Sequence, residues 1–117
     1  MLHGDFWPEN LLWQNGTLAA ILDWEDAALG DPLCDVAGCR VELRYRFGMA
    51  SMQRFTRAYA RHRLVDPERL ALWQVYVAAA AQRFMGEWGL APELEAHMRT
   101  EALASLREAG AALMGQT

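Results

Sequence analysis

Lysine is absent from this sequence of 117 residues, and all 11 of its basic residues are arginines. A phosphate-binding loop of the type that ends in a glycine–lysine pair is therefore excluded. Cysteine is scarce, since Cys34 and Cys39 are the only two. They form no Cys-x-x-Cys pair and have no histidine at zinc-ligand spacing, so a structural zinc site is not expected. We interpret both as small apolar side chains in a reducing compartment.

Long apolar runs are also missing. No stretch approaches the roughly 20 apolar residues that a membrane-spanning helix requires. The first residues, Met1 to Asp5, lack the basic and apolar regions of a secretory signal. We therefore expect a cytoplasmic protein with no membrane contact. Its composition, 53% hydrophobic and 22% charged, is that of an ordinary globular chain, and we expect one domain over residues 1–117.

Basic residues are absent from the first 35 positions, whereas acidic residues are frequent there. The acidic side chains of this segment are Asp5, Glu9, Asp23, Glu25, Asp26, Asp31 and Asp35. Carboxylates that pack closely repel one another unless a cation or a cationic ligand lies among them. The alternative is that these acids are solvated on loops or cap helices. The net charge of −4 argues against a nucleic-acid surface, and we expect no nucleic-acid partner.

A two-stranded hairpin is expected over residues 11–22. Two short apolar runs flank Asn15-Gly16, a pair that tolerates the positive φ angles of a tight hairpin turn. With a two-residue turn there, facing residues have numbers that sum to 31. Asp23 then lies opposite Pro8, two residues beyond the partner of Asn10, an offset of about 7 Å along the ladder. The hairpin therefore returns Asp23 to the region from which Asn10 departs.

About four helices are expected after the hairpin. Asp31-Pro32 and Asp66-Pro67 each combine a capping aspartate with a proline at the first helical position, which predicts helices over residues 32–44 and from residue 67 to about Gly86. Two more are predicted over residues 49–62 and from Pro92 onward. An apolar stripe on the third helix, interpreted as core packing, contains Leu70, Trp73, Val77, Ala80, Phe84 and Trp88. The expected fold class is therefore α+β, predominantly α.

Asp5, Asn10 and Asp23 have the chemistry of a metal-assisted transfer site. Oxygen ligands on two neighbouring strand ends suit a hard cation such as Mg²⁺, which binds through one or two protein oxygens plus substrate phosphates. The remaining carboxylate can accept the proton of an attacking hydroxyl. This is the division of roles found in kinase-type phosphoryl transfer.

Three segments, taken in order, resemble the aminoglycoside phosphotransferase and choline kinase family, relatives of the protein kinases. Residues 3–10, His-Gly-Asp-Phe-Trp-Pro-Glu-Asn, resemble its HGDxxxxN catalytic loop. Residues 21–25, Ile-Leu-Asp-Trp-Glu, resemble its metal-binding segment, and residues 30–37, Gly-Asp-Pro-Leu-Cys-Asp-Val-Ala, resemble the stretch that follows. The resemblance implies the C-terminal lobe of a protein-kinase-like fold, with catalytic and metal-binding loops in residues 1–37 and a helical part in residues 38–117.

The resemblance also implies an activity, namely ATP-dependent transfer of the γ-phosphate to the hydroxyl of a small molecule. Asp5 would be the catalytic aspartate, and Asn10 and Asp23 would be the Mg²⁺ ligands. His3 would brace the catalytic loop.

Four further acidic residues fall within the matched segments. Asp31 and Asp35 would anchor the following helix start against the catalytic loop, or simply cap that helix. Glu25 and Asp26 would contact an amine of the acceptor or a second metal, or lie on the solvated surface. Such a cluster suits a cationic acceptor such as an aminoglycoside, although the same loop serves choline, homoserine and other small molecules in the family.

The N-terminal nucleotide-binding lobe of the family, with its phosphate-pairing lysine, is absent from these residues. We therefore expect weak ATP binding and slow turnover by this chain alone. One alternative is a non-catalytic helical fragment that acts as an assembly or interaction module. Another, metal-dependent hydrolysis by His3, Asp5 and Asp23, is disfavoured because no second histidine lies at ligand spacing. We also expect exposed apolar faces that a homo-oligomer would cover.

Overall fold

The computed structural model describes residues 1–115 and has an α+β architecture that is predominantly helical, which confirms the predicted fold class. A short 3-10 helix, η1 (Pro8–Asn10), leads into an antiparallel hairpin formed by β1 (Leu11–Gln14) and β2 (Thr17–Ile21). Four α-helices follow, with a 3-10 turn, η2 (Met85–Glu87), before the last. They are α1 (Pro32–Phe47), α2 (Met49–Ala60), α3 (Pro67–Phe84) and α4 (Pro92–Leu113).

The helix starts follow the expected capping chemistry. The carboxylate of Asp31 accepts a hydrogen bond from the backbone N–H of Leu33, and that of Asp66 accepts from the N–H groups of Glu68 and Arg69. Each cap is followed by a proline, whose missing N–H costs nothing at that position. The end of α1 differs from the prediction, because the helix continues to Phe47 and stops at a glycine with a φ of +95°.

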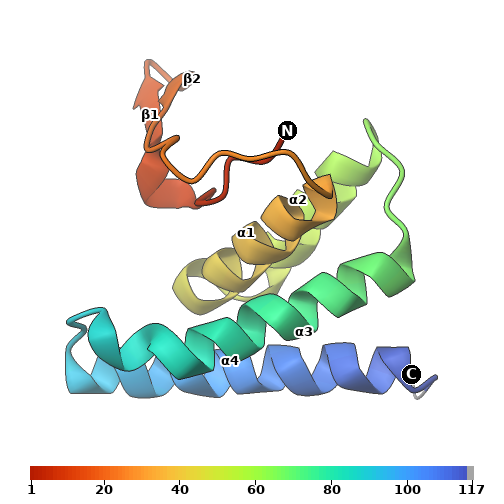
Figure 1. Ribbon diagram of the computed structural model, residues 1–117. Helices are drawn as coiled ribbons and strands as arrows, with labels where there is room; N and C mark the ends of the chain where they lie inside the picture. The colour runs from red at the N-terminus through yellow and green to blue at the C-terminus, as the bar shows by residue number, and fades with distance from the viewer. Residues whose placement is uncertain (116–117) are drawn as a thin grey trace.

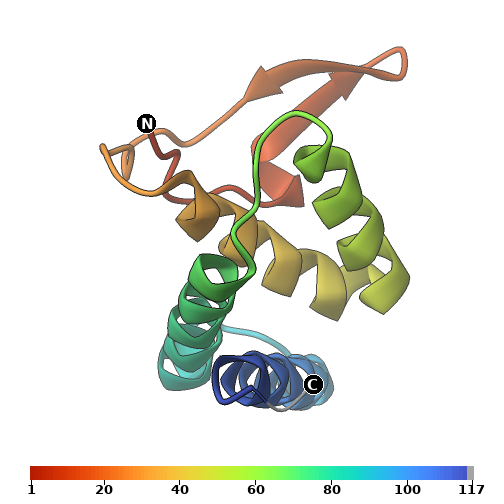
Figure 2. The same cartoon turned by 90° about the vertical axis from the view of Figure 1, so that its right-hand side faces the viewer.

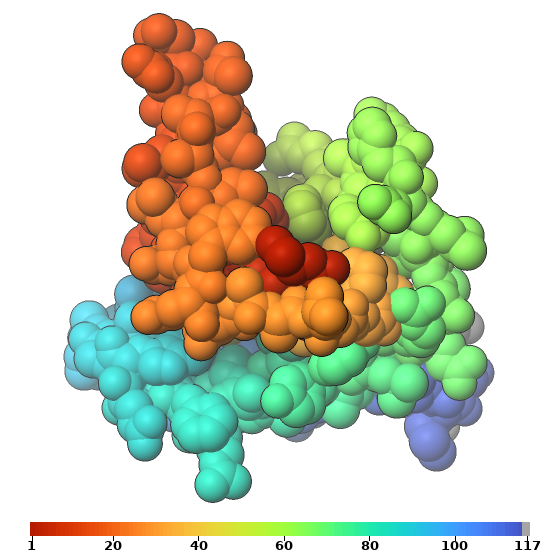
Figure 3. All heavy atoms as spheres, turned by 45° about the horizontal axis from the view of Figure 1, so that its top comes forward, coloured from red at the N-terminus to blue at the C-terminus, as the bar shows by residue number. Residues whose placement is uncertain are grey.

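The helices form a compact base from which the hairpin projects. α3 and α4 lie side by side and antiparallel, and α1 packs across them with α2 on its far side (Figure 1). Viewed along α3 and α4, α1 and α2 lie between that pair and the hairpin (Figure 2). The space-filling view shows the hairpin standing out from the body as a separate column (Figure 3). Its strands pair only with each other among the described residues.

Small side chains fill the contact between α3 and α4. The buried residues of α3 are Ala71, Gln74, Ala78 and Ala81, and those of α4 are Met98, Ala102, Ser105 and Ala109. The apolar stripe predicted to be core on α3 is displaced by one residue from the face of the helix that is buried. Its last members, Phe84 and Trp88, are 45% and 43% exposed. That prediction is wrong for Phe84 and Trp88, whereas Val77 packs against the core. Periodicity gives the spacing of a buried face, not which of two adjacent faces meets the partner helix.

The apolar core lies where α1 meets the α3–α4 pair. Its buried members are Val41, Tyr45, Ala81, Met85, Met98 and Ala102. Cys39 is buried and Cys34 is half-buried, and both thiols are free. Burial raises the pKa of Cys39 to about 12, so this thiol behaves as an apolar side chain.

Many large apolar side chains remain exposed. They include Leu12, Trp13 and Leu18 on the hairpin and Leu72, Tyr76 and Phe84 on α3. No helix among the described residues is long and apolar enough to cross a membrane. Coverage of the exposed side chains by a second copy of the chain stays a prediction.

Candidate active site

The hairpin turn adopts the predicted conformation, but its strands are out of the predicted register. Asn15 and Gly16 have φ angles of 53° and 77°. Next to the turn, Trp13 pairs with Leu18 as expected, whereas Leu12 pairs with Ala20. A β-bulge therefore inserts one extra residue in β2, and every pairing beyond it is shifted by one.

The bulge moves Asp23 closer to Asn10 than the regular register would. The backbone N–H of Leu22 donates a hydrogen bond of 2.7 Å to the carbonyl oxygen of Asn10. Asp23 is therefore the residue immediately after the partner of Asn10, instead of two residues beyond it. Its φ of 58° lies in the left-handed region, so the chain turns away from the strand direction at this residue.

His3 joins three separate segments. Its Nδ1 atom accepts a hydrogen bond of 3.1 Å from the backbone N–H of Asp5, so the ring proton lies on Nε2. Nε2 in turn donates to the carbonyl oxygen of Leu22 over 2.6 Å. The backbone N–H of His3 donates to the carboxylate of Asp35 over 2.7 Å. The buried imidazole of His3 thus links the first loop to the residue that follows β2, and the backbone N–H of His3 links the same loop to α1.

Asp35 and Gly4 fix the backbone of the first loop. The second carboxylate oxygen of Asp35 accepts from the N–H of Gly4 over 3.0 Å, so one side chain on α1 binds two successive backbone donors. Gly4 has a φ of +91°, and a Cβ there would lie 2.5 Å from the carbonyl oxygen of Asp26. Only glycine satisfies both constraints, which explains the small residue between His3 and Asp5.

Asp5 and Asn10 are held together by the amide of Asn10. The buried Asn10 donates from Nδ2 to the backbone oxygen of Asp5 over 2.8 Å and to its Oδ2 over 3.2 Å. Asp5 is exposed, and so is Asp23. Within residues 1–115, no three His, Cys, Asp or Glu side chains come together as a metal site.

Asp31 faces α3 and not the first loop. Besides capping α1, its carboxylate accepts two hydrogen bonds from Arg69, of 2.6 and 3.0 Å, and one of 2.9 Å from Nε1 of Trp73. The hydrogen bonds from Arg69 are the main reason why the pKa of Asp31 lies well below its usual range. The expected anchoring of the loop is therefore made by Asp35, while Asp31 fastens α1 to α3.

A cleft of about 820 Å³ lies between the first loop, α1 and the exposed face of α3. Its acidic lining residues are Asp5, Asp26, Asp35 and Glu42, and its aromatic ones are Phe6, Trp7, Tyr45, Tyr76, Phe84 and Trp88. No basic side chain lines it. Burial raises the pKa of Glu42, while its ion pair with Arg46 acts in the opposite direction. Glu25, the other acid of this region, is exposed and does not line the cleft.

Sequence reasoning missed the helical walls of this cleft. Glu42 and Tyr45 lie on α1 outside the recognised segments, and Phe84 was assigned to the core. Arg46 was also missed. It pairs with Glu42 and with Glu9 and lies 4.6 Å from the ring centre of Trp7, so it fastens η1 to α1. The aromatic stripe of α3 was the available signal for the cleft, because its members are larger than a close helix–helix contact accepts.

The chain is similar to two named proteins. Over 61 residues it is 34% identical to Hygromycin-B 4-O-kinase from Escherichia coli, a stretch that covers 52% of this chain and 17% of that protein. Over 96 residues it is 28% identical to Acyl-CoA dehydrogenase family member 10 from Mus musculus, covering 67% of this chain and 9% of that protein. The chain therefore spans less than a fifth of either relative. No solved structure gives a significant match.

A family comparison matches the part of the chain that contains the motifs. The model of the phosphotransferase enzyme family matches residues 1–73, which is more than half of the chain. The matched stretch contains the three segments compared above and the side chains of Asp5, Asn10 and Asp23. The chain therefore belongs to the phosphotransferase enzyme family, as the resemblance of its motifs to aminoglycoside phosphotransferases predicted.

Proposed function

We propose that the protein is an ATP-dependent phosphotransferase that transfers the γ-phosphate of ATP to a hydroxyl group of a small molecule. The proposal rests on the arrangement of Asp5, Asn10 and Asp23. The carboxylate of Asp5 lines the cleft and is held by Asn10, and Asp23 follows the residue whose N–H is bonded to Asn10. These are the residue types that kinase-type transfer uses to position a nucleophile and to hold a metal.

In this proposal the acceptor hydroxyl lies in the cleft beside Asp5. The hydroxyl oxygen forms a bond to the γ-phosphorus, the bond from that phosphorus to the bridging oxygen of ADP breaks, and the hydroxyl proton passes to Asp5. Asn10 donates to Oδ2 of Asp5, which leaves the other carboxylate oxygen to accept the proton. ADP then leaves with the electron pair of the broken bond.

The oxygen donors beside Asp5 fit Mg²⁺. The amide nitrogen of Asn10 is engaged by Asp5, so its Oδ1 is the atom that can bind a cation. Asp23, which follows the residue bonded to the backbone of Asn10, adds an exposed carboxylate. Both nitrogens of the His3 ring are occupied, so His3 is not a ligand. When bound, Mg²⁺ would offset the charge of the ATP phosphates and orient them.

We further propose that His3 and Asp35 are positioning residues and that the acceptor carries positive charge. His3 and Asp35 together hold the backbone on which Asp5 lies. Acidic and aromatic side chains without a basic one favour an ammonium group in the cleft, through charge and through the faces of the rings. The relative named Hygromycin-B 4-O-kinase supports a small-molecule hydroxyl as the acceptor.

The experiment is transfer of label from radiolabelled ATP to a panel of cationic and neutral alcohols, under single-turnover conditions because the chain has no lysine for the phosphates. Asp5→Asn and Asp23→Asn are expected to reduce transfer by at least about 100-fold. Glu93→Gln, an exposed acid on α4, is the matched control and should leave it unchanged. Full activity in Asp5→Asn, or no transfer to any alcohol of the panel, would overturn the proposal.

A second measurement separates the catalytic proposal from a non-catalytic assembly module. Mn²⁺ in place of Mg²⁺ should broaden the NMR signals of residues near Asn10 and Asp23, and calorimetry should detect binding of the metal–ATP complex. The exposed hairpin, with Trp13 63% exposed, is the observation that favours the module. If Mn²⁺ broadens no NMR signals and the metal–ATP complex does not bind, the non-catalytic assembly module is favoured further.

A further inference from the structure

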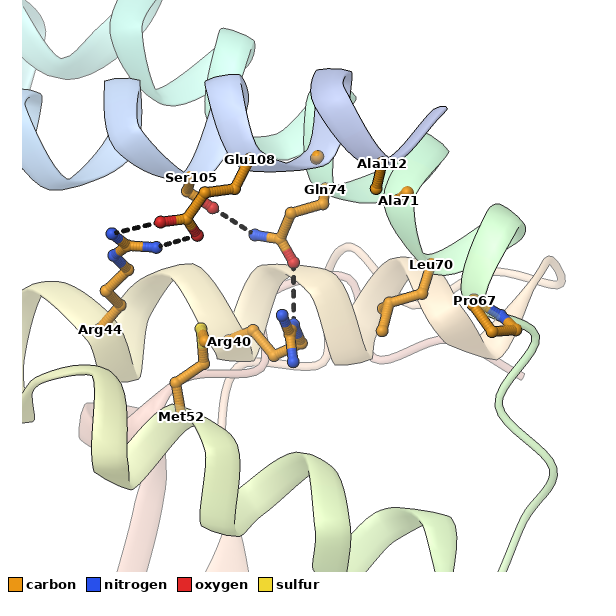
Figure 4. A pocket seen from close by; sticks show the side chains of 11 residues that line it. Arg40, Arg44, Met52, Pro67, Leu70, Ala71, Gln74, Ser105, Glu108 and Ala112 are labelled. Atoms are coloured by element: carbon orange, nitrogen blue, oxygen red, sulfur yellow. Dashed lines mark hydrogen bonds and ion pairs between the residues drawn. The ribbon is translucent and has the colours of Figure 1, made fainter. Parts of the chain in front are cut away.

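A smaller cavity of about 210 Å³ lies on the other side of α1 from the catalytic cleft, bounded by α2, α3 and α4 (Figure 4). The two share no lining residue. Apolar side chains, among them Met52, Leu70 and Ala109, form most of its wall. Two arginines of α1, Arg40 and Arg44, also line it.

The two arginines lie one helical turn apart and differ in how their charge is balanced. Arg44, only 7% exposed, donates to the carboxylate of Glu101 over 2.9 Å and to that of Glu108 over 2.7 and 3.3 Å. Arg40 forms no ion pair with the described residues, and its hydrogen-bond partners are the neutral Gln74 and Thr56. Burial is the main cause of the lowered pKa of Arg40, and the charge of Glu108 acts in the opposite direction without forming an ion pair with it.

The neutral partners hold the guanidinium of Arg40 in a defined orientation. Gln74 is buried, and its Nε2 donates to Oγ of Ser105 over 2.9 Å, which turns its Oε1 toward Arg40 at 3.0 Å. The hydroxyl of Thr56 donates to the carbonyl of Met52 and accepts from Arg40. Figure 4 shows Gln74 between Ser105 and Arg40. Partners among the described residues are found for two of the five N–H groups of Arg40.

We propose that this cavity binds a short aliphatic carboxylate. Its two oxygens would accept hydrogen bonds from the remaining N–H groups of Arg40, whose planar fork matches a carboxylate. Its alkyl chain would lie against Met52, Leu70 and Ala109. A cavity of this size takes a ligand of only a few heavy atoms, because drug-sized ligands need roughly 300 Å³ or more.

The balance of charges favours a singly charged ligand with an apolar part. Glu108 also lines the cavity, and its carboxylate would repel a doubly charged phosphate more strongly than a monocarboxylate. The apolar wall gives phosphate nothing to contact, whereas an alkyl chain leaves water on binding.

The test is calorimetric titration of the 117-residue chain with butyrate, compared with inorganic phosphate and chloride at constant ionic strength. Arg40→Gln should weaken butyrate binding by at least about tenfold. Arg57→Gln, which removes the same charge from an exposed position on α2, should change it less than about twofold. Since Arg40→Gln removes part of a buried network, its folding is checked by circular dichroism.

Ala112→Leu provides a second variant that does not depend on that network. Ala112 lines the cavity and is exposed, so a larger side chain should reduce the cavity without unfolding the chain. Butyrate binding should weaken at least about fivefold, with unchanged circular dichroism. No saturable butyrate binding by the native chain, or equal binding by all variants, would overturn the proposal. Equal binding of butyrate, phosphate and chloride would mean an adventitious ion only.

Discussion

The backbone N–H of Asp5 donates to Nδ1 of His3 over 3.1 Å, and this bond allows only one neutral tautomer of the imidazole. The other ring nitrogen is thereby committed to the carbonyl of Leu22, at 2.6 Å. Two backbone groups that are 17 positions apart, on Asp5 and on Leu22, are therefore held by one side chain. A side chain at position 3 that can bond to only one of these backbone groups leaves the other without a hydrogen-bond partner.

His3→Gln should destabilise the chain by about 2 to 3 kcal/mol, because glutamine cannot reach both backbone groups and one of them loses its partner. Urea unfolding followed by circular dichroism measures this loss. His62→Gln, at an exposed position, is the control and should change the free energy of unfolding by less than about 0.5 kcal/mol. Equal effects of the two substitutions would contradict the linking role of His3.

Gly4→Ala should be more destabilising than Gly48→Ala by about 2 kcal/mol or more. The two glycines have similar φ angles, +91° and +95°, so the conformational cost of a side chain is matched. They differ in the room available for a side chain. A Cβ at Gly4 would lie 2.5 Å from the carbonyl oxygen of Asp26, whereas a Cβ at Gly48 would have no atom within 4 Å. Urea midpoints of the two variants give the difference directly, and equal midpoints would show that the contact with Asp26 relaxes freely.

Acid should destabilise the chain partly through Asp31. Hydrogen bonds from Arg69 lower the pKa of this carboxyl, so its ionised form contributes stability above the unfolded pKa of about 4. That contribution is lost as the pH falls below about 4 toward the lower folded value. Asp31→Asn should therefore be less stable at neutral pH and should lose less stability over the acid range. Urea midpoints measured at several pH values test this.

Glu93→Gln is the control for the acid prediction, because Glu93 is exposed on the first turn of α4. The urea midpoint of the Glu93→Gln variant should change with pH in the same way as that of the native chain. A pH dependence of Asp31→Asn that is as steep as the native one would contradict the assignment. Asp31→Ala should cost about a further 1 kcal/mol at every pH, since the cap of α1 is then lost.

We expect the exposed apolar side chains to drive association of the chain with itself. Leu12, Trp13 and Leu18 of the hairpin are 48%, 63% and 42% exposed. Sedimentation velocity should show a concentration-dependent dimer, and Trp13→Thr should shift the equilibrium toward monomer. Gln14→Thr on the same strand is the control. A chain that remains monomeric and binds no apolar dye would contradict this prediction.

Local chemistry made several elements predictable from the sequence. Asn15-Gly16 indicated the hairpin turn because both residues accept positive φ angles, and Asp31 and Asp66 marked helix starts because their side chains accept backbone N–H bonds. The carboxyl end of α1 was less predictable. Gly48 ends it, but nothing between Arg44 and Phe47 indicates how far the helix extends.

The candidate site was predictable in its residue types but not in its surroundings. Asp5, Asn10 and Asp23 are close in sequence or connected by a hairpin, so spacing could relate them. Glu42 reaches the cleft from the middle of α1, and its role depends on how α1 lies against the first loop. Such tertiary relationships leave no periodic signal. The register was mispredicted for a similar reason, since a bulge has no reliable mark in the sequence.

The pairing of the two strands makes the length of β1 matter more than the composition of the hairpin. Substitutions at exposed positions of the strands should be tolerated, because their side chains contact little. Deleting Ala19, the extra residue, would close the bulge and leave Leu22 opposite Asn10, whereas deleting one residue of β1 would shift the partner of Asn10 by one position along β2 and displace Asp23 by one residue. Variation among natural relatives is therefore expected in the residue types of this hairpin, and at the extra residue of β2, far more than in the number of residues in β1, although the segment lies at the surface.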